Sequence, residues 1–273
     1  MTKMLMKISR AYAILPIFLL IVGVLVGISQ PPPVWMKKGS YAEYKFETRS
    51  VVFLNNTLLL FRDRASVIYR WECIEFNGTI AKLNVSITFS EKEKHVFLST
   101  EVYVNTVNRD VFLTNGTLVG KTRLWGPVAP EKGETIVLWY NPPDRVIGNV
   151  IDIEGGWSWT PHGAQRIFIV EGNGTIRGQT ISLTILYDFD TGIMIEGSLY
   201  YEATLLALSI IDPGRAGPMQ LINTNIDLGP KEIWPEILNI LLIAMPIIAF
   251  LMIFALVHHC RRKRRKIVQR KIF

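Results

Sequence analysis

The side chains that could do chemistry are few, and several are gathered in one stretch. Residues 155–163 read Gly-Gly-Trp-Ser-Trp-Thr-Pro-His-Gly and combine two tryptophans and a histidine with flexible glycines. Exposed indole rings can stack on sugars or on apolar ligands, and they can equally cap the end of a sheet. Trp157, Trp159 and His162 are therefore the candidate ligand-binding residues, with a structural role as the alternative.

The rest of the sequence contains no motif typical of catalysis or of metal binding. His95 and His162 have no carboxylate or cysteine at a metal-ligand spacing. Gly-x-Ser-x-Gly, His-Glu-x-x-His and phosphate-cradling glycine motifs do not occur. Residues 188–192, Asp-Phe-Asp-Thr-Gly, resemble the start of a calcium loop, but Ile193 and Leu199 replace the glycine and glutamate that such a loop needs. We expect no catalytic residue, no metal site and no cofactor.

Asparagine supplies a different kind of chemistry, because Asn-x-Ser/Thr tripeptides accept N-linked glycans in exported proteins. The five tripeptides begin at Asn55, Asn77, Asn84, Asn115 and Asn173. Three of them read Asn-Gly-Thr, and Asn-Gly is also a strong turn signal, so turn preference accounts for part of their number. We expect glycosylation at most of the five positions.

Two long apolar segments, residues 11–28 and 237–257, bracket this chemistry. A helix over 237–257 spans roughly 31 Å, close to the ~30 Å hydrocarbon thickness of a bilayer. Residues 233–257 are therefore predicted to form a transmembrane helix, with Trp234 at the outer interface.

The first apolar segment has two interpretations. A positive start, an apolar run and small residues before Gln30 fit a secretory signal peptide cleaved after Ser29. The length of the run also fits a retained signal anchor. The mature protein then has one or two transmembrane helices, and in both cases residues between the two segments lie outside the cell.

The formal net charge of +7 is concentrated at the two ends. Residues 1–29 hold three Lys and Arg and residues 258–273 hold eight, with no acid in either range. Between residues 30 and 257, 19 basic residues stand against 23 acidic ones, a net charge of −4. This distribution argues against nucleic-acid binding and places the basic ends in the cytoplasm. The tail is expected to attract anionic lipid headgroups.

The two cysteines offer no disulfide framework. Cys260 lies beyond the second apolar segment, so the predicted topology separates it from Cys73 by the membrane. Cys73 alternates in phase with Tyr69 and Trp71, which favours a small buried hydrophobic residue over a reactive thiol.

Residues 34–211 show the period-two alternation of β strands. Residues 81–90 alternate apolar and polar side chains without interruption, as in a half-buried strand. We predict an all-β antiparallel ectodomain, a curved sheet or sandwich with bulged hairpins, together with one or two transmembrane α-helices. Further strands are expected over 41–52, 67–73, 96–104, 135–140, 146–153, 165–171 and 181–189.

Two hairpins can be specified in detail. The first turns at Gly78, which supplies the positive φ of a type I turn with a G1 bulge, and it pairs Trp71 with Leu83. The second uses the same device and pairs Phe189 with Ile193.

Pro and Gly mark the boundaries of the predicted domain. The chain divides into a signal peptide or signal anchor (1–29), a Pro-rich spacer (30–33), an all-β extracellular domain (34–211), a Pro/Gly stalk (212–232), the transmembrane helix (233–257) and a basic cytoplasmic tail (258–273).

The runs Gly-Lys-Thr-Arg-Leu-Trp-Gly-Pro at 120–127 and Tyr-Asp-Phe-Asp-Thr-Gly at 187–192 carry a resemblance. Over about residues 34–205 the chain resembles uncharacterised archaeal cell-surface proteins that are membrane-anchored and N-glycosylated. The resemblance implies an all-β ectodomain and no particular activity. A more distant similarity is to the curved sheets of lipoprotein carriers, which hold acyl chains on a concave face and would imply lipid binding.

Three classes of function follow. The first is a non-enzymatic, membrane-anchored surface protein that binds a ligand or a partner, for example as an accessory subunit of an envelope or membrane complex. The second is a membrane-tethered carrier of a lipid or another hydrophobic ligand. The third is an ectoenzyme, which would need Asp, Glu or His side chains clustered in a cleft.

Overall fold

The computed structural model describes residues 33–92, 94–160, 163–214, 219–229 and 244–246. Within these residues the strands form one 13-stranded antiparallel sheet, accompanied by a five-residue helix, α2 (Ala203–Ala207). The all-β antiparallel fold expected from the sequence is confirmed for this part of the chain.

The strands differ widely in length. In chain order they are β1 (Tyr41–Phe53), β2 (Leu58–Phe76), β3 (Ile80–Glu91), β4 (Lys94–Asn105), β5 (Asp110–Leu113), β6 (Leu118–Lys121), β7 (Thr135–Asn141), β8 (Asp144–Thr160), β9 (Gly163–Ile176), β10 (Gln179–Asp188), β11 (Met194–Gly197), β12 (Ile210–Asp212) and β13 (Met219–Thr224). Each strand expected from the alternation is present, in most cases a few residues longer at one or both ends.

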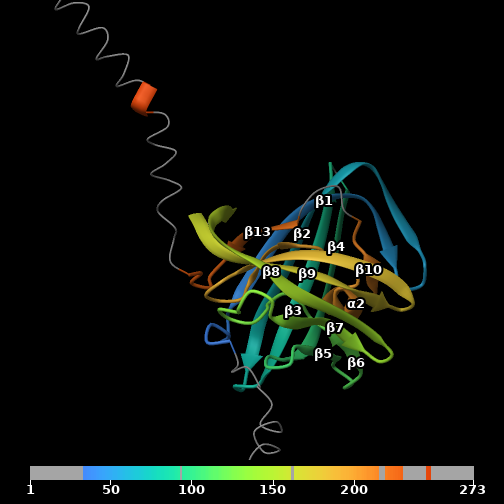
Figure 1. Cartoon of the computed structure of the whole chain (residues 1–273). Coiled ribbons are helices and arrows are strands. Elements are labelled where there is room, and N and C mark those ends of the chain that lie inside the picture. The colour runs from blue at the N-terminus through green and yellow to red at the C-terminus, as the bar shows by residue number, and fades with distance from the viewer. Residues whose placement is uncertain (1–32, 93, 161–162, 215–218, 230–243, 247–273) are drawn as a thin grey trace, which may run out of the picture.

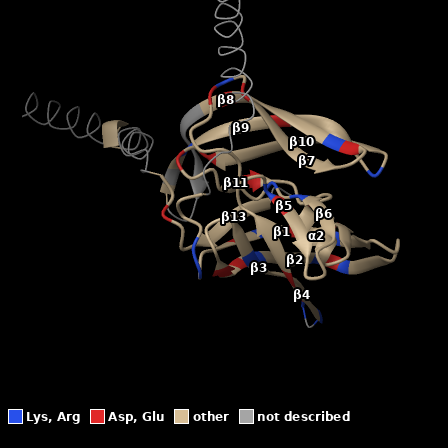
Figure 2. Cartoon of the chain, turned by 90° about the horizontal axis from the view of Figure 1, so that it is seen from below, with Lys and Arg blue, Asp and Glu red and all other residues tan. Residues whose placement is uncertain are grey.

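The sheet is rolled, so that its two halves face each other. Its strand order is β6-β5-β4-β3-β2-β1-β13-β11-β10-β9-β8-β7, and β12 pairs with β1. Strands β8 to β10 cross β2 to β4 in Figure 1, and Figure 2 shows β7 to β10 and β1 to β4 as two layers. Twisted sheets of more than about ten strands commonly curl in this way. The apolar faces of both halves therefore share one interior.

The rolled sheet brings its two end strands, β6 and β7, together. The Asn141 side-chain amide donates a hydrogen bond to the Val119 carbonyl at 3.2 Å. Gly120 lies against the ring of Trp139, and a Cβ atom at Gly120 would come within 2.3 Å of that ring. Close approach of the backbone to an indole explains why this position is glycine.

Aromatic side chains fill the interior. The largest fully buried side chains are Trp71, Trp125, Trp139, Arg123, Tyr44, Tyr69, Tyr187, Phe89, Phe168, Leu83, Ile87 and Leu124. The rings of Trp35, Trp71 and Trp125 have centroids 5.8–6.0 Å apart in tilted or edge-on geometry, which suits the quadrupoles of aromatic rings. Arg123 is the one charged residue in this set, and its surroundings are described with the site below.

The β2–β3 hairpin keeps the predicted faces but not the predicted register. Trp71 pairs with Val85, two residues from the expected Leu83. Next to the turn, Glu75 pairs with Lys82, three residues beyond the partner that a loop over 76–78 would give it, and a one-residue bulge at Ile74 reduces the offset to two. Gly78 adopts the expected positive φ of 93°. A shift of two residues leaves every side chain on its own face, so alternation by itself does not detect the shift.

The second hairpin has the predicted register over part of its length. Leu186 pairs with Glu196, the register that Phe189 opposite Ile193 would give. Nearer the turn the register shifts by one residue, so Tyr187 pairs with Met194 and the Asp188 N–H donates to the Ile193 carbonyl at 2.8 Å. The predicted pair of Phe189 with Ile193 is therefore wrong. Gly192 adopts a φ of 72°, as the turn requires. The return strand is short, because β11 ends at Gly197 and is followed by a turn and by α2.

Part of the predicted stalk, residues 212–232, belongs to the sheet instead. Strand β13 lies between β1 and β11, with Met219 and Leu221 buried. The strand is six residues long and follows a Pro/Gly-rich segment. Its alternation of apolar and polar side chains is too short to predict a strand. The stalk prediction is wrong for residues 219–224.

The membrane-spanning segments predicted from the sequence are scarcely covered by the described residues. Residues 11–28 and all of 237–257 except 244–246 lie outside them. In the described part of the chain, no helix combines the length and the apolar character needed to cross a membrane.

Gly120→Ala is expected to destabilise the fold by about 2–5 kcal/mol, because the new methyl group meets Trp139 and φ is 151°. Gly133→Ala is the matched control, since φ is 90° there and nothing lies within 4 Å of the added Cβ; its expected cost is about 1–2 kcal/mol. Urea unfolding of the full-length protein in detergent measures both. Equal costs would contradict close contact between β6 and β7.

Candidate functional site

The predicted ligand-binding residues do not all lie in a loop. Trp157 and Trp159 belong to β8, which continues to Thr160 and pairs with β9 from Gly163 onward. His162 lies outside the described residues. The predicted nine-residue loop is wrong, because most of it forms the end of a long hairpin.

All five glycosylation candidates have exposed side chains. Asn55, Asn77 and Asn115 lie in turns between strands, whereas Asn84 and Asn173 lie on β3 and β9. In the three turn positions, the side-chain oxygen accepts a hydrogen bond from the backbone N–H of the threonine two residues on, at 2.9–3.2 Å. This is the Asx turn that asparagine favours.

Cys73 and His95 have simple surroundings. Cys73 is fully buried, its Sγ donates to the Glu75 carbonyl at 3.3 Å, and burial raises the pKa of the thiol. These observations agree with the predicted role as a small buried residue. His95 Nδ1 lies 3.1 Å from Ser90 Oγ on an exposed hairpin. Among the described residues, no group of three or more His, Cys, Asp and Glu side chains could hold a metal ion.

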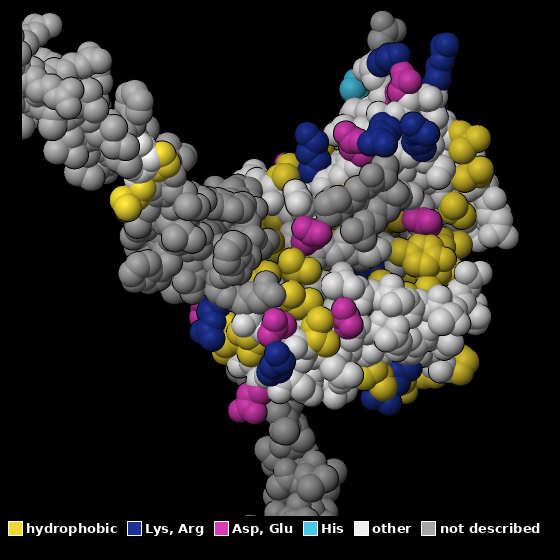
Figure 3. All heavy atoms as spheres, turned by 45° about the horizontal axis from the view of Figure 1, so that its top comes forward, with side chains coloured by type: hydrophobic (Ala, Val, Ile, Leu, Met, Phe, Trp, Pro, Cys, Tyr) yellow, Lys and Arg dark blue, Asp and Glu magenta, His cyan; other side chains and the backbone are white. Residues whose placement is uncertain are grey.

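Charged side chains on the described surface are mixed in sign. Arg64 and Glu47 lie 3.3 Å apart, and Lys92 and Asp63 lie 2.6 Å apart. Figure 3 shows Lys and Arg side chains beside Asp and Glu side chains on the face in view. Such exposed pairs contribute about 0–1 kcal/mol each to stability.

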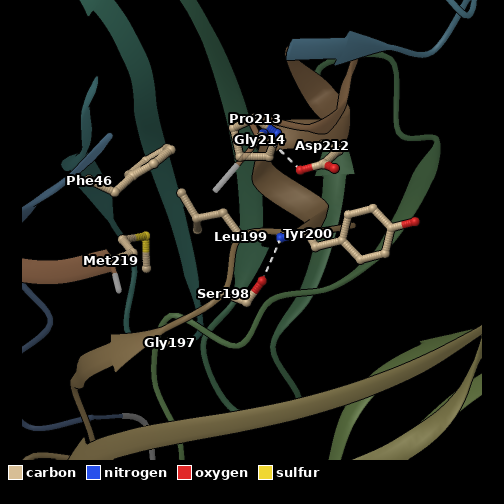
Figure 4. Close-up of a pocket in the computed structure, with 9 residues that line it drawn as sticks. All are labelled: Phe46, Gly197, Ser198, Leu199, Tyr200, Asp212, Pro213, Gly214 and Met219. Carbon is tan, nitrogen blue, oxygen red and sulfur yellow. Dashed lines mark hydrogen bonds between the residues drawn. The ribbon is translucent and has the colours of Figure 1, made fainter. Parts of the chain in front are cut away.

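A pocket of about 370 Å³ opens in the wall of the rolled sheet. This wall pocket is lined by Phe46, Gly197, Ser198, Leu199, Tyr200, Asp212, Pro213, Gly214 and Met219. In Figure 4 the side chains of Phe46, Leu199 and Met219 gather on one side, while the ring of Tyr200 points away from them. The volume lies in the lower part of the range of about 300–1,000 Å³ that is usual for ligand pockets.

The wall pocket exists because β1 changes partners along its length. On one edge, β13 pairs with β1 over Ala42–Lys45 and β12 pairs with it at Val52–Phe53. The intervening part of that edge is approached by the segment after β12. Gly214, with a φ of 63°, lies so close to β1 that a Cβ atom there would come within 2.0 Å of the Ser50 carbonyl oxygen.

The wall pocket has an apolar wall and one carboxylate. Phe46, Leu199 and Met219 are nearly fully buried. Asp212 Oδ1 accepts a hydrogen bond from the Gly214 N–H at 2.8 Å (Figure 4), and burial raises the pKa of this carboxyl. A ligand with a hydrocarbon body and a hydrogen-bond donor would match this lining.

A buried ion pair lies behind the wall pocket. Arg123 and Glu202 have no exposed side-chain surface, and Arg123 Nε lies 3.6 Å from Glu202 Oε2. Glu202 also accepts hydrogen bonds from the Thr122 hydroxyl and, at 3.2 Å, from the Arg123 backbone N–H. Burial lowers the pKa of Arg123, because desolvation penalises the charged form.

Arg123 connects this pair to the pocket wall. Its Nε donates to the Ser198 carbonyl at 3.1 Å, and its Nη2 donates to the Tyr200 carbonyl. Tyr187 OH donates to the Arg123 carbonyl at 3.0 Å. The guanidinium therefore fixes the path of the segment that lines the wall pocket.

The ion pair was missed in the sequence. Arg123 lies two residues before Trp125 in the run 120–127, and Glu202 is 79 residues further along the chain. The sequence shows only that Arg123 stands among large apolar residues. The same pattern is common in strands at the protein surface, so it does not indicate a buried charge. Nothing local indicates that the two charges meet.

Glu202→Gln is expected to destabilise the protein by about 3–5 kcal/mol, because it leaves the Arg123 charge buried without its carboxylate. Glu47→Gln is the control. It breaks the pair with Arg64, whose side chains are 52% and 55% exposed, and its expected cost is within about 1 kcal/mol. Urea denaturation of both variants provides the comparison. A small effect at Glu202 would contradict the burial of the Arg123–Glu202 pair.

Comparison with known proteins adds little to these observations. No protein-family model matches the chain, and no curated protein matches it. Among solved structures, a protein from Bacteroides fragilis NCTC 9343 that has a YmcC-like fold and is inferred to be exported aligns at 11% identity. The alignment covers 69% of this chain and 96% of that protein, with a TM-score of 0.33. This similarity is too low to transfer a fold or a function.

Proposed function

We propose that the chain is a membrane-anchored extracellular glycoprotein whose β domain binds a ligand or a partner and performs no catalysis. The observation that carries the proposal is the exposure of all five asparagines of the Asn-x-Ser/Thr tripeptides on one folded unit. A glycan needs an exposed attachment point, and each of these side chains provides one without disturbing the core. The apolar segments at 11–28 and 237–257, with their basic flanks, support an extracellular position for this unit.

The first and last described residues of the β domain lie on the same side of it, which supports anchoring of that side to the membrane. Val34 and Gly229 line the same surface hollow. Trp35 Nε1 donates to the Thr191 carbonyl at 2.7 Å, and the Gly229 N–H lies 3.5 Å from Asp188 Oδ1. The chain therefore enters and leaves the domain at the turn after β10. Two anchors, or one anchor and a cleaved signal, would hold this side toward the membrane.

Each segment of such a protein would have its own binding partner. The apolar helix contacts the bilayer, and the basic tail at 258–273 attracts anionic headgroups. The domain itself would bind outside the cell, as a component of an envelope assembly or as an accessory subunit of a membrane complex.

A second candidate function, a membrane-tethered carrier of a hydrophobic ligand, is favoured by the wall pocket. Phe46, Leu199 and Met219 give it an apolar lining, and its volume suits a small molecule. The space between the layers offers less, since Trp71, Trp125 and Trp139 occupy it. A ligand in the wall pocket would be more compact than the acyl chains held by lipoprotein carriers.

Glycosylation is tested by expressing the full-length chain in an N-glycosylating host and measuring its intact mass before and after enzymatic deglycosylation. The mass is expected to fall, and Asn→Gln substitution at an occupied position removes one glycan increment. Asn108→Gln is the control, because Asn108 is exposed and is not followed by the acceptor pattern. An unchanged mass in the parent protein would contradict the proposal.

The carrier candidate is tested by native mass spectrometry of the full-length protein extracted from its own membrane in mild detergent. A bound small molecule is expected, and Ser198→Trp, which fills part of the wall pocket, should displace it. Thr184→Trp, at an exposed position of β10, should leave the molecule bound. A stoichiometric protein partner with no small molecule would favour the accessory role instead.

A further inference from the structure

A second arginine, Arg109, lies in an unusual setting just before β5. Its backbone φ is 67°, a left-handed conformation that is uncommon for a residue with a side chain. Nη1 donates to the Trp125 carbonyl at 2.9 Å, and Nη2 donates to the Val137 carbonyl at 2.7 Å. These bonds hold the guanidinium still while using two of its five N–H donors.

Arg109 differs from its neighbouring cations in lacking a carboxylate. Lys121 lies 3.1 Å from Asp110, and Arg123 lies 3.6 Å from Glu202. Among the described residues, no carboxylate comes within 4 Å of the Arg109 guanidinium. Arg109 is half-buried, and desolvation lowers the pKa of its guanidinium, whereas the charges of Glu202 and Asp110 act in the opposite direction. A partly desolvated cation with no anion in contact gains from a negatively charged partner.

Arg109 lines a pocket of about 290 Å³, which we name the arginine pocket. Its lining residues are Pro33, Thr106, Val107, Arg109, Trp125, Gly126 and Val128. None of them carries a negative charge. Trp125 is 1% exposed, and its indole N–H has no hydrogen-bond acceptor among the described residues. The pocket therefore combines a cation that has no carboxylate within 4 Å, among the described residues, with an otherwise uncharged lining.

We propose that the arginine pocket binds the carboxylate group of a small organic acid with an apolar body. The guanidinium fork matches a carboxylate in two parallel hydrogen bonds, and the bonds to the Trp125 and Val137 carbonyls leave three of its five N–H donors for this purpose. Pro33, Val107 and Val128 provide apolar surface for the rest of the ligand. Because the two backbone carbonyls already orient Arg109, little freedom is lost on binding.

This inference is independent of the wall pocket and of its proposed ligand. The wall pocket has a carboxylate, Asp212, and would repel an organic acid, whereas the arginine pocket has only a cation. The two pockets have no lining residue in common. Either proposal can therefore fail while the other holds.

The test uses the full-length protein in detergent micelles, labelled with 5-fluorotryptophan. The seven tryptophans give separate fluorine resonances, and Trp125→Phe identifies the one of interest. Benzoate is the probe, benzamide is its uncharged counterpart, and inorganic phosphate tests a bare anion. We expect benzoate to shift the Trp125 resonance saturably and benzamide to have at least about tenfold weaker affinity, which corresponds to 1.4 kcal/mol.

Variants at the rim locate the binding. Val128 is 52% exposed, so Val128→Asp should fold normally while placing a negative charge at the pocket, and it should weaken benzoate binding about tenfold or more. Leu58→Asp is the matched control, since Leu58 is also 52% exposed and lies at the start of β2.

Four results would overturn the proposal. Equal binding of benzamide would indicate an apolar pocket without a role for the charge. A response to phosphate but not to benzoate would indicate a site for inorganic anions. Unchanged benzoate affinity in Val128→Asp, or no shift of the Trp125 resonance, would place any binding elsewhere.

Discussion

The buried pair of Arg123 and Glu202 is the interaction on which the interior depends. Glu202 stands directly before α2, and its carboxylate turns inward to Thr122 and Arg123. Arg123 in turn holds the carbonyls of the segment between β11 and α2. A buried ion pair contributes little net stability, but it is costly to leave either charge alone. The pair therefore favours one arrangement of the connection between the two halves of the sheet.

The geometry of the rolled sheet determines where pockets form. A continuous sheet leaves no opening, and the wall pocket lies where β1 changes from β13 to β12 as its neighbour. The arginine pocket lies near the junction of the end strands, where Arg109 reaches the Val137 carbonyl of β7. Both openings occur at interruptions in the ladder, because there side chains and loops replace regular hydrogen bonding. Irregular backbone at the rim of a rigid sheet is a common position for binding sites.

The sequence predicted the fold class and most of the strands, because period-two alternation reports directly which residues face the core. It predicted the β2–β3 hairpin in the correct phase but two residues from its true register, since a net shift of two residues leaves every side chain on its own face. It missed β13, whose six residues follow a Pro/Gly-rich segment. The ligand-binding role of Trp157, Trp159 and His162 stays a prediction. The two pockets were not predicted, because the residues that line each of them come from segments far apart in the chain.

The sequence by itself determined the local properties of this protein: alternating strands, glycine turns, acceptor tripeptides, and apolar segments with basic flanks. Each of these depends on residues close together in the chain, so composition and spacing suffice to identify them. Only the tertiary structure decided that Arg123 meets Glu202, that no carboxylate of the described residues pairs with Arg109, and that β1 changes its neighbour from β13 to β12 beside the wall pocket. Those properties depend on which distant segments the rolled sheet brings together, and the spacing of residues along the chain carries no record of that pairing.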